Sequence, residues 1–300
     1  MAEPTVRQPV RAGSFYPSDA RECREELAEC RRLAAKVPAE LRGAKILGGI
    51  VPHAGWVYSG PTAAAVFEAL VTGAEKPETV ILFGTAHRPD VREAALQARG
   101  SWRVPTGEVG IDEELAAEML AQAGRSGALV ERASAHGGDH AIEVQLPFLI
   151  EFLPGARFVP VAAAHGKGGP EAGEAAARAV QKLGRRAVAL ASTDLTHYGP
   201  NYYGWAPQGV GAKAHRWSKE VNDRKLIERM LALDAAGTFQ VGEEDGSACG
   251  PAAAAAAVAF AKALGAKKGI LIEHITSWER AKHEQGEPTD FVGYAAVAFV

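Results

Sequence analysis

The sequence predicts an α/β fold: a single domain with a central, mostly parallel sheet and helices on both faces. Short continuous apolar runs alternate with longer segments of helical spacing, which is typical of buried parallel strands joined by helices. No linker rich in Ser, Gly or Pro and no change of composition divides the 300 residues. We therefore expect one domain over residues 1–300. The opening RQPVRAGSFYP is not periodic, and it predicts an ordered N-terminal arm over residues 1–17.

Strands are expected where a few apolar residues stand together and turn residues bound them. The runs KILGGIV and TVILFG are the first two, and RFVPVAA and RAVALAS follow later in the chain. Two closing strands are expected near the C-terminus. The predicted strands are residues 45–51, 79–84, 157–163, 186–192, 269–275 and 291–300.

Helices are expected between these strands, where apolar residues recur at helical spacing. Ser18 and Asp19 are candidate caps of the first helix, and Asp112 of the third. Pro61 is expected in the first turn of a helix, and Pro147 is expected to kink or break one. The predicted helices are residues 18–37, 62–71, 112–123, 140–153, 170–183, 213–233 and 248–264.

Composition and charge exclude several classes of protein. The chain has 33 basic and 36 acidic residues and a formal charge of −3, which argues against a nucleic-acid partner. Its longest apolar run is mostly alanine and is broken by Lys262, so we expect no membrane span. Three cysteines cannot form a disulfide framework, and the first residues lack the apolar core of a signal peptide. These features predict a cytoplasmic protein.

Polar side chains follow three of the predicted strands. His53 comes just after the first strand, His87 just after the second, and Asp194 and His197 just after the fourth. In an open parallel sheet, ligands bind at the carboxyl ends of the strands, where the following loops converge. One histidine in such a place is most often structural, but three strands with the same arrangement indicate a site.

Cys249 lies in GSACGP, directly before a predicted helix. A helix N-terminus favours the thiolate form of cysteine, which is the form that binds metals or acts as a nucleophile. The alternative is a small buried residue in a tight turn. Two histidines and a cysteine are suitable ligands for iron, zinc or copper, although their wide spacing matches no compact zinc motif.

The other histidines are less informative. His140 begins HAIEVQLPF, with Glu143 one helical turn along the same face, so His140 could reach the cavity or simply cap a helix. We expect His136 to be solvated, and His215 and His274 to be surface or structural residues.

Several motifs together resemble those of a known family. HAGWVYSGP, FGTAH, DHAIEVQLPFL, STDLTHYG, ACGP and VGYAA stand in the same order as in the Memo family, whose bacterial and archaeal members are called AmmeMemoRadiSam system protein B. The resemblance runs from about Arg7 to the C-terminus. That family is similar in fold to class III extradiol dioxygenases of the LigB type, which implies a single LigB-like α/β domain.

In those dioxygenases two histidines and one glutamate hold non-haem iron. The resemblance places His53 and His87 at the histidine positions and Cys249 at the carboxylate position. A thiolate is a softer ligand than a carboxylate, so the expected cofactor is iron or copper, with zinc as a further option. The exchange puts ordinary ring cleavage in doubt.

The resemblance also implies roles for three further residues. His197 would match the acid–base position, Asp194 would lie beside the metal, and His140 would take the second histidine position around the substrate.

Three functions follow as hypotheses. The first is a metal-dependent oxidoreductase that acts on an unknown small substrate, with His197 moving a proton. The second is a non-enzymatic binding protein that uses a former dioxygenase cleft for a peptide or a partner protein. The family name links it to an AMMECR-type domain and a radical SAM protein as partners. The third, a hydrolase with Cys249 as nucleophile, is the least favoured.

Overall fold

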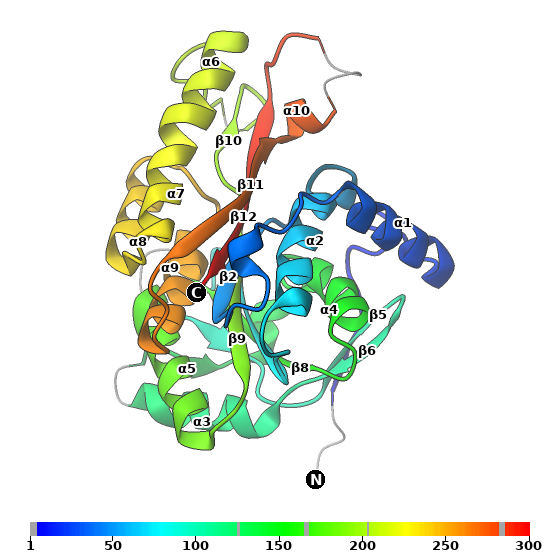
Figure 1. Ribbon diagram of the computed structural model, residues 1–300, viewed down its shortest axis with the longest axis vertical. Helices are drawn as coiled ribbons and strands as arrows, with labels where there is room; N and C mark the ends of the chain where they lie inside the picture. Colours follow the sequence, from blue (N-terminus) through cyan, green and yellow to red (C-terminus); the bar gives the residue numbers. More distant parts are fainter. Residues whose placement is uncertain (1–4, 125–126, 165–167, 203, 282–285) are drawn as a thin grey trace.

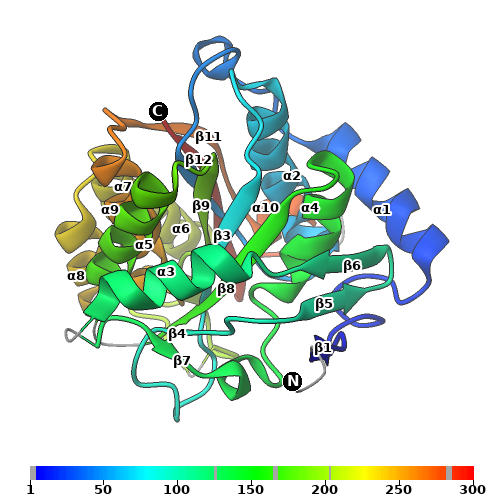
Figure 2. The same cartoon turned by 90° about the horizontal axis from the view of Figure 1, so that it is seen from below.

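The computed structural model describes residues 5–124, 127–164, 168–202, 204–281 and 286–300, and shows a sheet between two layers of helices (Figures 1 and 2). Helices α1, α2 and α4 cover one face, and α3, α5, α7, α8 and α9 cover the other. Their bounds are α1 Ala20–Leu33, α2 Trp56–Thr72, α3 Glu113–Ala123, α4 Leu146–Phe152, α5 Gly169–Leu183, α6 Ala212–Trp217, α7 Arg224–Leu231, α8 Ala235–Glu244, α9 Pro251–Ala263 and α10 Ser277–Arg280.

The main sheet of the described chain runs in the order β10-β12-β2-β9-β3-β8-β4-β7, with β11 paired to the free side of β12. Its four central strands β2, β9, β3 and β8 are parallel and fully or almost fully buried, as their continuous apolar sequences predict. The bounds are β2 Gly48–Val51, β3 Thr79–Thr85, β4 Ala95–Leu96, β7 Val130–Glu131, β8 Arg157–Ala163, β9 Ala187–Ser192, β10 His197–Tyr198, β11 Gly269–Thr276 and β12 Phe291–Phe299.

The predicted α/β class with helices on both faces is confirmed. The sheet is mixed toward its edges, because β12 runs antiparallel to β2, β10 and β11, and β4 runs antiparallel to β8. The last two strands form a hairpin-like pair, so no crossover helix makes them parallel.

The helices α5 and α9 approach each other closely through small residues. A side-chain carbon added at Gly173 would overlap the carbonyl of Ala256, so only glycine fits this contact. The alanine-rich sequence of α9 is therefore explained by burial on all sides between α5, α8 and the sheet.

The N-terminal arm pairs with a small separate sheet and then crosses the surface to α1. Strand β1 (Val6–Arg7) pairs in parallel with β5 (Ser101–Val104), and β5 pairs with β6 (Gly107–Gly110). Residues 1–4 of the predicted arm lie outside the described residues.

Two local predictions differ from the structure. Pro61 lies inside α2, because that helix begins earlier, at Trp56. The predicted helix 140–153 is a 3-10 turn at Glu143–Gln145 followed by α4 from Leu146, so the helical segment is broken next to Pro147, which lies in the first turn of α4. Proline fits a first turn, where its missing N–H has no partner to lose.

Within the described residues, every helix is too short or too polar to cross a membrane.

Candidate metal centre

Three of the predicted site residues lie together at the carboxyl edge of the parallel strands. His53 follows β2, His87 follows β3, and Cys249 precedes the first turn of α9. One nitrogen of each imidazole and the Cys249 sulfur all lie within 4.8 Å of one another. The fold therefore joins residues that are far apart in sequence, because neighbouring parallel strands end at the same edge. That these atoms bind a metal stays a prediction.

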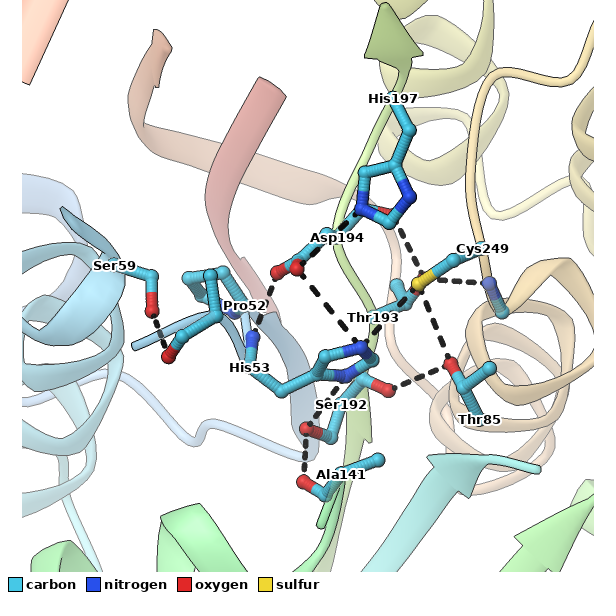
Figure 3. Close-up of polar contacts among 12 residues, drawn as sticks. Pro52, His53, Ser59, Thr85, Ala141, Ser192, Thr193, Asp194, His197 and Cys249 are labelled. Atoms are coloured by element: carbon cyan, nitrogen blue, oxygen red, sulfur yellow. Dashed lines mark hydrogen bonds and ion pairs between the residues drawn. The ribbon is translucent and has the colours of Figure 1, made fainter. Parts of the chain in front are cut away.

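The Cys249 thiol is surrounded by polar side chains (Figure 3). The Cys249 sulfur is 3.4 Å from Nε2 of His53. The hydroxyl oxygens of Thr85 and Thr193 each lie 3.7 Å from the same sulfur. Each hydroxyl already donates its one hydrogen to a backbone carbonyl, Thr85 to Ser192 at 3.2 Å and Thr193 to Asp194 at 2.9 Å. Of these three contacts, the His53 imidazole is therefore the one that favours the anionic form of the sulfur.

Each candidate imidazole is oriented by a partner behind it. Nδ1 of His53 is 3.4 Å from the Ser192 hydroxyl, which itself donates to the Ala141 carbonyl at 2.6 Å (Figure 3). Nδ1 of His87 is 3.2 Å from a carboxylate oxygen of Asp139, and the His87 amide donates to the other oxygen at 2.7 Å. Histidines that bind metals have such a partner on the far nitrogen, which aims the near one.

The charges of the cluster are strongly coupled. Burial opposes ionisation of the Cys249 thiol, but the charge of His53 and hydrogen bonds from His53 and His87 outweigh it and hold the pKa of the thiol well below its usual value. Burial likewise opposes protonation of His53, yet Asp194 and Cys249 raise its pKa to about 9. The metal-free cluster therefore favours a thiolate beside a protonated imidazole.

Asp194 and His197 lie on the loop after β9, next to the cluster. One oxygen of Asp194 accepts the His53 amide at 2.7 Å, and the other lies 3.7 Å from Nε2 of His197 (Figure 3). Burial opposes the charge of Asp194, but His53 and His197 lower its pKa to about 2. Burial also opposes protonation of His197, while its bond to Asp194 raises its pKa. Both residues thus line the same cavity as His53 and His87.

His140 packs against both histidines of the cluster. Its ring stacks on His87 at 4.7 Å and lies edge-on to His53 at 5.4 Å. The ring of Phe15, in the arm, is tilted against the His140 ring, with the two ring centres 4.4 Å apart. Burial, followed by the charges of His53 and His87, lowers the pKa of His140 to about 3, so this imidazole is neutral.

Two cavities meet at the cluster. One of about 340 Å³ is lined by His53, His140, Asp194 and the arm residue Phe15. A second of about 680 Å³ reaches Cys249. His87, His197 and Tyr202 line both cavities. Cavities of this size accommodate small organic ligands.

Sequence reasoning missed several contributors. Asp139, which holds His87, stands next to His140 in the sequence, and this adjacent carboxylate was the only local signal for it. Phe15 and Tyr202 gave no signal. Glu143 was expected on the same face as His140, but it is fully buried against the N-terminal arm. His136 was expected in solvent and is buried, with 2% of its surface exposed, beside the ring of Trp102.

Fold and site together define an α/β protein with a His, His, Cys cluster at the carboxyl edge of its parallel strands. Residues 7–298 match the family model described as "Memo-like protein". The chain belongs to this family.

Relatives of the same length are similar along the whole chain. A MEMO1 family protein of Methanopyrus kandleri is 37% identical over 98% of each chain. One of Thermococcus onnurineus is 34% identical over 98% of this chain and 99% of its own. A solved protein of Escherichia coli K12, titled uncharacterized, aligns with 75% of this chain and 87% of its own at a TM-score of 0.45 and 14% identity.

Proposed function

We propose that the chain is a metal-dependent oxidoreductase in which His53, His87 and Cys249 hold iron or copper. The observation that carries the proposal is the convergence of their three donor atoms within 4.8 Å beside a cavity of about 340 Å³. The substrate would be a small molecule that enters this cavity.

The donor set fits such a metal. Two imidazole nitrogens and one thiolate suit iron, copper or zinc, and the thiolate shifts the preference toward softer metals. The partners Ser192 and Asp139 aim the two imidazoles toward the sulfur, as ligand histidines require. Iron or copper in this place would supply electron transfer and would bind oxygen atoms of a substrate or of dioxygen.

The remaining side chains of the cavity supply proton transfer and shape. His197 can hold or give up a proton at Nε2, because Asp194 stabilises its charged form at 3.7 Å. His140 is neutral and can exchange hydrogen bonds with an uncharged substrate group. Phe15 covers His140 on the arm side and excludes water there.

Metal content tests the ligand assignment. Protein purified without oxygen is loaded with iron(II) or copper(I) and measured by mass spectrometry, as wild type and as His53→Ala and Cys249→Ser. Both variants should lose most of the bound metal, whereas Cys30→Ala, which changes a cysteine on α1, should keep it. Equal metal in wild type and both site variants would contradict the assignment.

Oxygen uptake tests the reaction class. The metal-loaded protein is mixed with a panel of catechols and related small oxygen-rich aromatics, and dioxygen consumption is followed. His197→Gln should keep its metal and lose uptake by roughly 10²–10⁴-fold, the range for a general acid or base. A loaded wild type that consumes no dioxygen with any member would instead favour a binding role for the cleft.

A further inference from the structure

The loop between β9 and β10 is the connection through which the site is held together. Asp194 of this loop accepts the His53 amide with its side chain at 2.7 Å, and its carbonyl accepts the Cys249 amide at 3.2 Å. His197 stands at the far end of the loop. A shift of this loop would therefore move the backbone of two candidate ligands as well as His197.

A π-helical turn packs directly under this loop. Residues Ser218–Asp223 form a π-helix between α6 and α7, and the three segments make one continuous helical rod beside β10 (Figure 1). Such turns are rare and often occur near functional sites, because the wider turn changes the directions of its side chains. Its last two residues, Asn222 and Asp223, lie side by side against the loop.

Both of these side chains bind the same residue. Asn222 donates from its amide to the Thr196 hydroxyl at 3.0 Å, and the Thr196 backbone amide donates to Asp223 at 3.1 Å. All three are buried, at 2%, 0% and 0% exposure for Asn222, Asp223 and Thr196. Thr196 directly precedes His197, so its backbone and side chain are both fixed next to the candidate acid–base residue.

The carboxylate is itself held from the opposite side. Its second oxygen lies 3.0 Å from Nε2 of His274 on β11. A side-chain carbon at Gly293 would collide with this carboxylate, so glycine leaves the space that Asp223 needs. Gly293 also donates its amide to the Thr196 carbonyl at 3.0 Å. A buried carboxylate is costly unless it is fully paired, and here it is paired on both oxygens.

We propose that Asn222 and Asp223 are positioning residues, which use the π-helical turn to fix Thr196 and thereby set the places of His197, Asp194 and the Cys249 backbone. The expected effect on metal affinity rests on the proposed function. The expected effect on the position of His197 does not, because it needs no metal. His274 orients the Asp223 carboxylate for its contact with Thr196.

Two readouts test the proposal on the full-length protein. The imidazole signals of His197 are followed by NMR in metal-free protein, and the affinity for iron(II) is measured by anaerobic titration. Asn222→Ala and Asp223→Ala should shift the His197 signals and weaken iron(II) binding by about tenfold, the lower end for residues behind metal ligands. Asp223→Asn keeps an oxygen for the Thr196 amide and should restore most of both readouts.

Glu220→Gln is the matched control, because it removes a carboxylate from an exposed position of the same π-helical turn. It should change neither readout. If Asp223→Ala does not fold, Asn222→Ala still decides the question, because it removes the bond to the Thr196 hydroxyl. Folded Asn222→Ala and Asp223→Ala proteins with wild-type His197 signals and iron(II) affinity would overturn the proposal. A wild type that binds neither iron(II) nor copper(I) would overturn the proposed function alone, since the NMR readout needs no metal.

Discussion

Two fully buried carboxylates hold segments that border the site, and they do so differently. Glu143 accepts hydrogen bonds from Arg7, the amides of Val10 and Arg11, and the Tyr16 hydroxyl, all within 2.8–3.0 Å. It thereby holds the N-terminal arm, which carries Phe15 to the cavity. Asp223 holds the loop that carries His197.

The difference lies in what else fastens each segment. The loop is joined to strands on both sides, and its Leu195 amide donates to the Gly293 carbonyl at 2.8 Å. The arm is paired to β5 at Val6–Arg7, but from Val10 to Tyr16 it meets Glu143, more than a hundred residues away along the chain. Loss of Asp223 should therefore move the loop slightly while it stays attached to the sheet, whereas loss of Glu143 should release residues 10–16 of the arm.

The largest expected effect is that of Glu143→Ala. It leaves the Arg7 guanidinium and two amides without their buried partner, and breaking a buried pair in this way costs about 3–5 kcal/mol of unfolding free energy. Urea unfolding measures this loss. Limited proteolysis should also show cleavage within the arm, which Asp223→Ala should not show. If the arm of Glu143→Ala resists proteolysis as the wild type does, the difference proposed between Glu143 and Asp223 is wrong.

The second-largest expected effect is a loss of unfolding free energy in acid, caused by His136. Burial, then the charge of Arg7, lowers the pKa of His136 to about 3, below its ordinary value of 6.5. As the pH falls, the unfolded chain therefore binds a proton at His136 that the folded chain does not bind. The contribution of His136 to the free energy of unfolding is complete above pH 6.5 and is lost as the pH falls toward 3. Between pH 7 and 5 the wild type should lose about 2 kcal/mol more unfolding free energy than His136→Gln.

Equilibrium unfolding in urea at several pH values measures this difference. Comparing each pH with the variant removes the contributions of all other titrating groups. Parallel pH curves for wild type and His136→Gln would show that His136 does not carry the acid dependence.

Tyr16→Phe should have the smallest effect. It removes one of the hydrogen bonds to Glu143, at 2.8 Å, while the Arg7 and backbone donors remain. The expected loss is about 1.5 kcal/mol, the value for a hydrogen bond to a charged group. Thermal unfolding checks it, with Tyr58→Phe, which lines the cavity, as a control. A loss as large as that of Glu143→Ala would mean that one donor, rather than the set, holds the arm.

Much of the fold could be predicted because its signals are local. The runs that became β3, β8 and β9 are continuous and apolar, and Asp19 and Asp112 cap α1 and α3 as expected. Short strands such as β4 and β7 carry no such pattern, because their pairing depends on neighbours brought in by the rest of the chain. The antiparallel direction of β12 was also set by pairing rather than by its own sequence.

The candidate ligands were visible for the same reason. His53 and His87 follow apolar runs directly, and Cys249 precedes a helix, so their places at strand and helix ends can be read locally. The partners that orient them could not be predicted. Ser192 and Asp139 become partners of His53 and His87 only when separate segments meet.

By itself, the sequence determined which side chains stand at the ends of strands and helices, because hydrophobic runs and caps act over a few residues. Only the tertiary structure decided which of them meet, and which carboxylates serve as supports rather than as members of the site. Glu143 and Asp223 bind partners across long stretches of chain, and a buried charge takes its role from whatever the fold places against it.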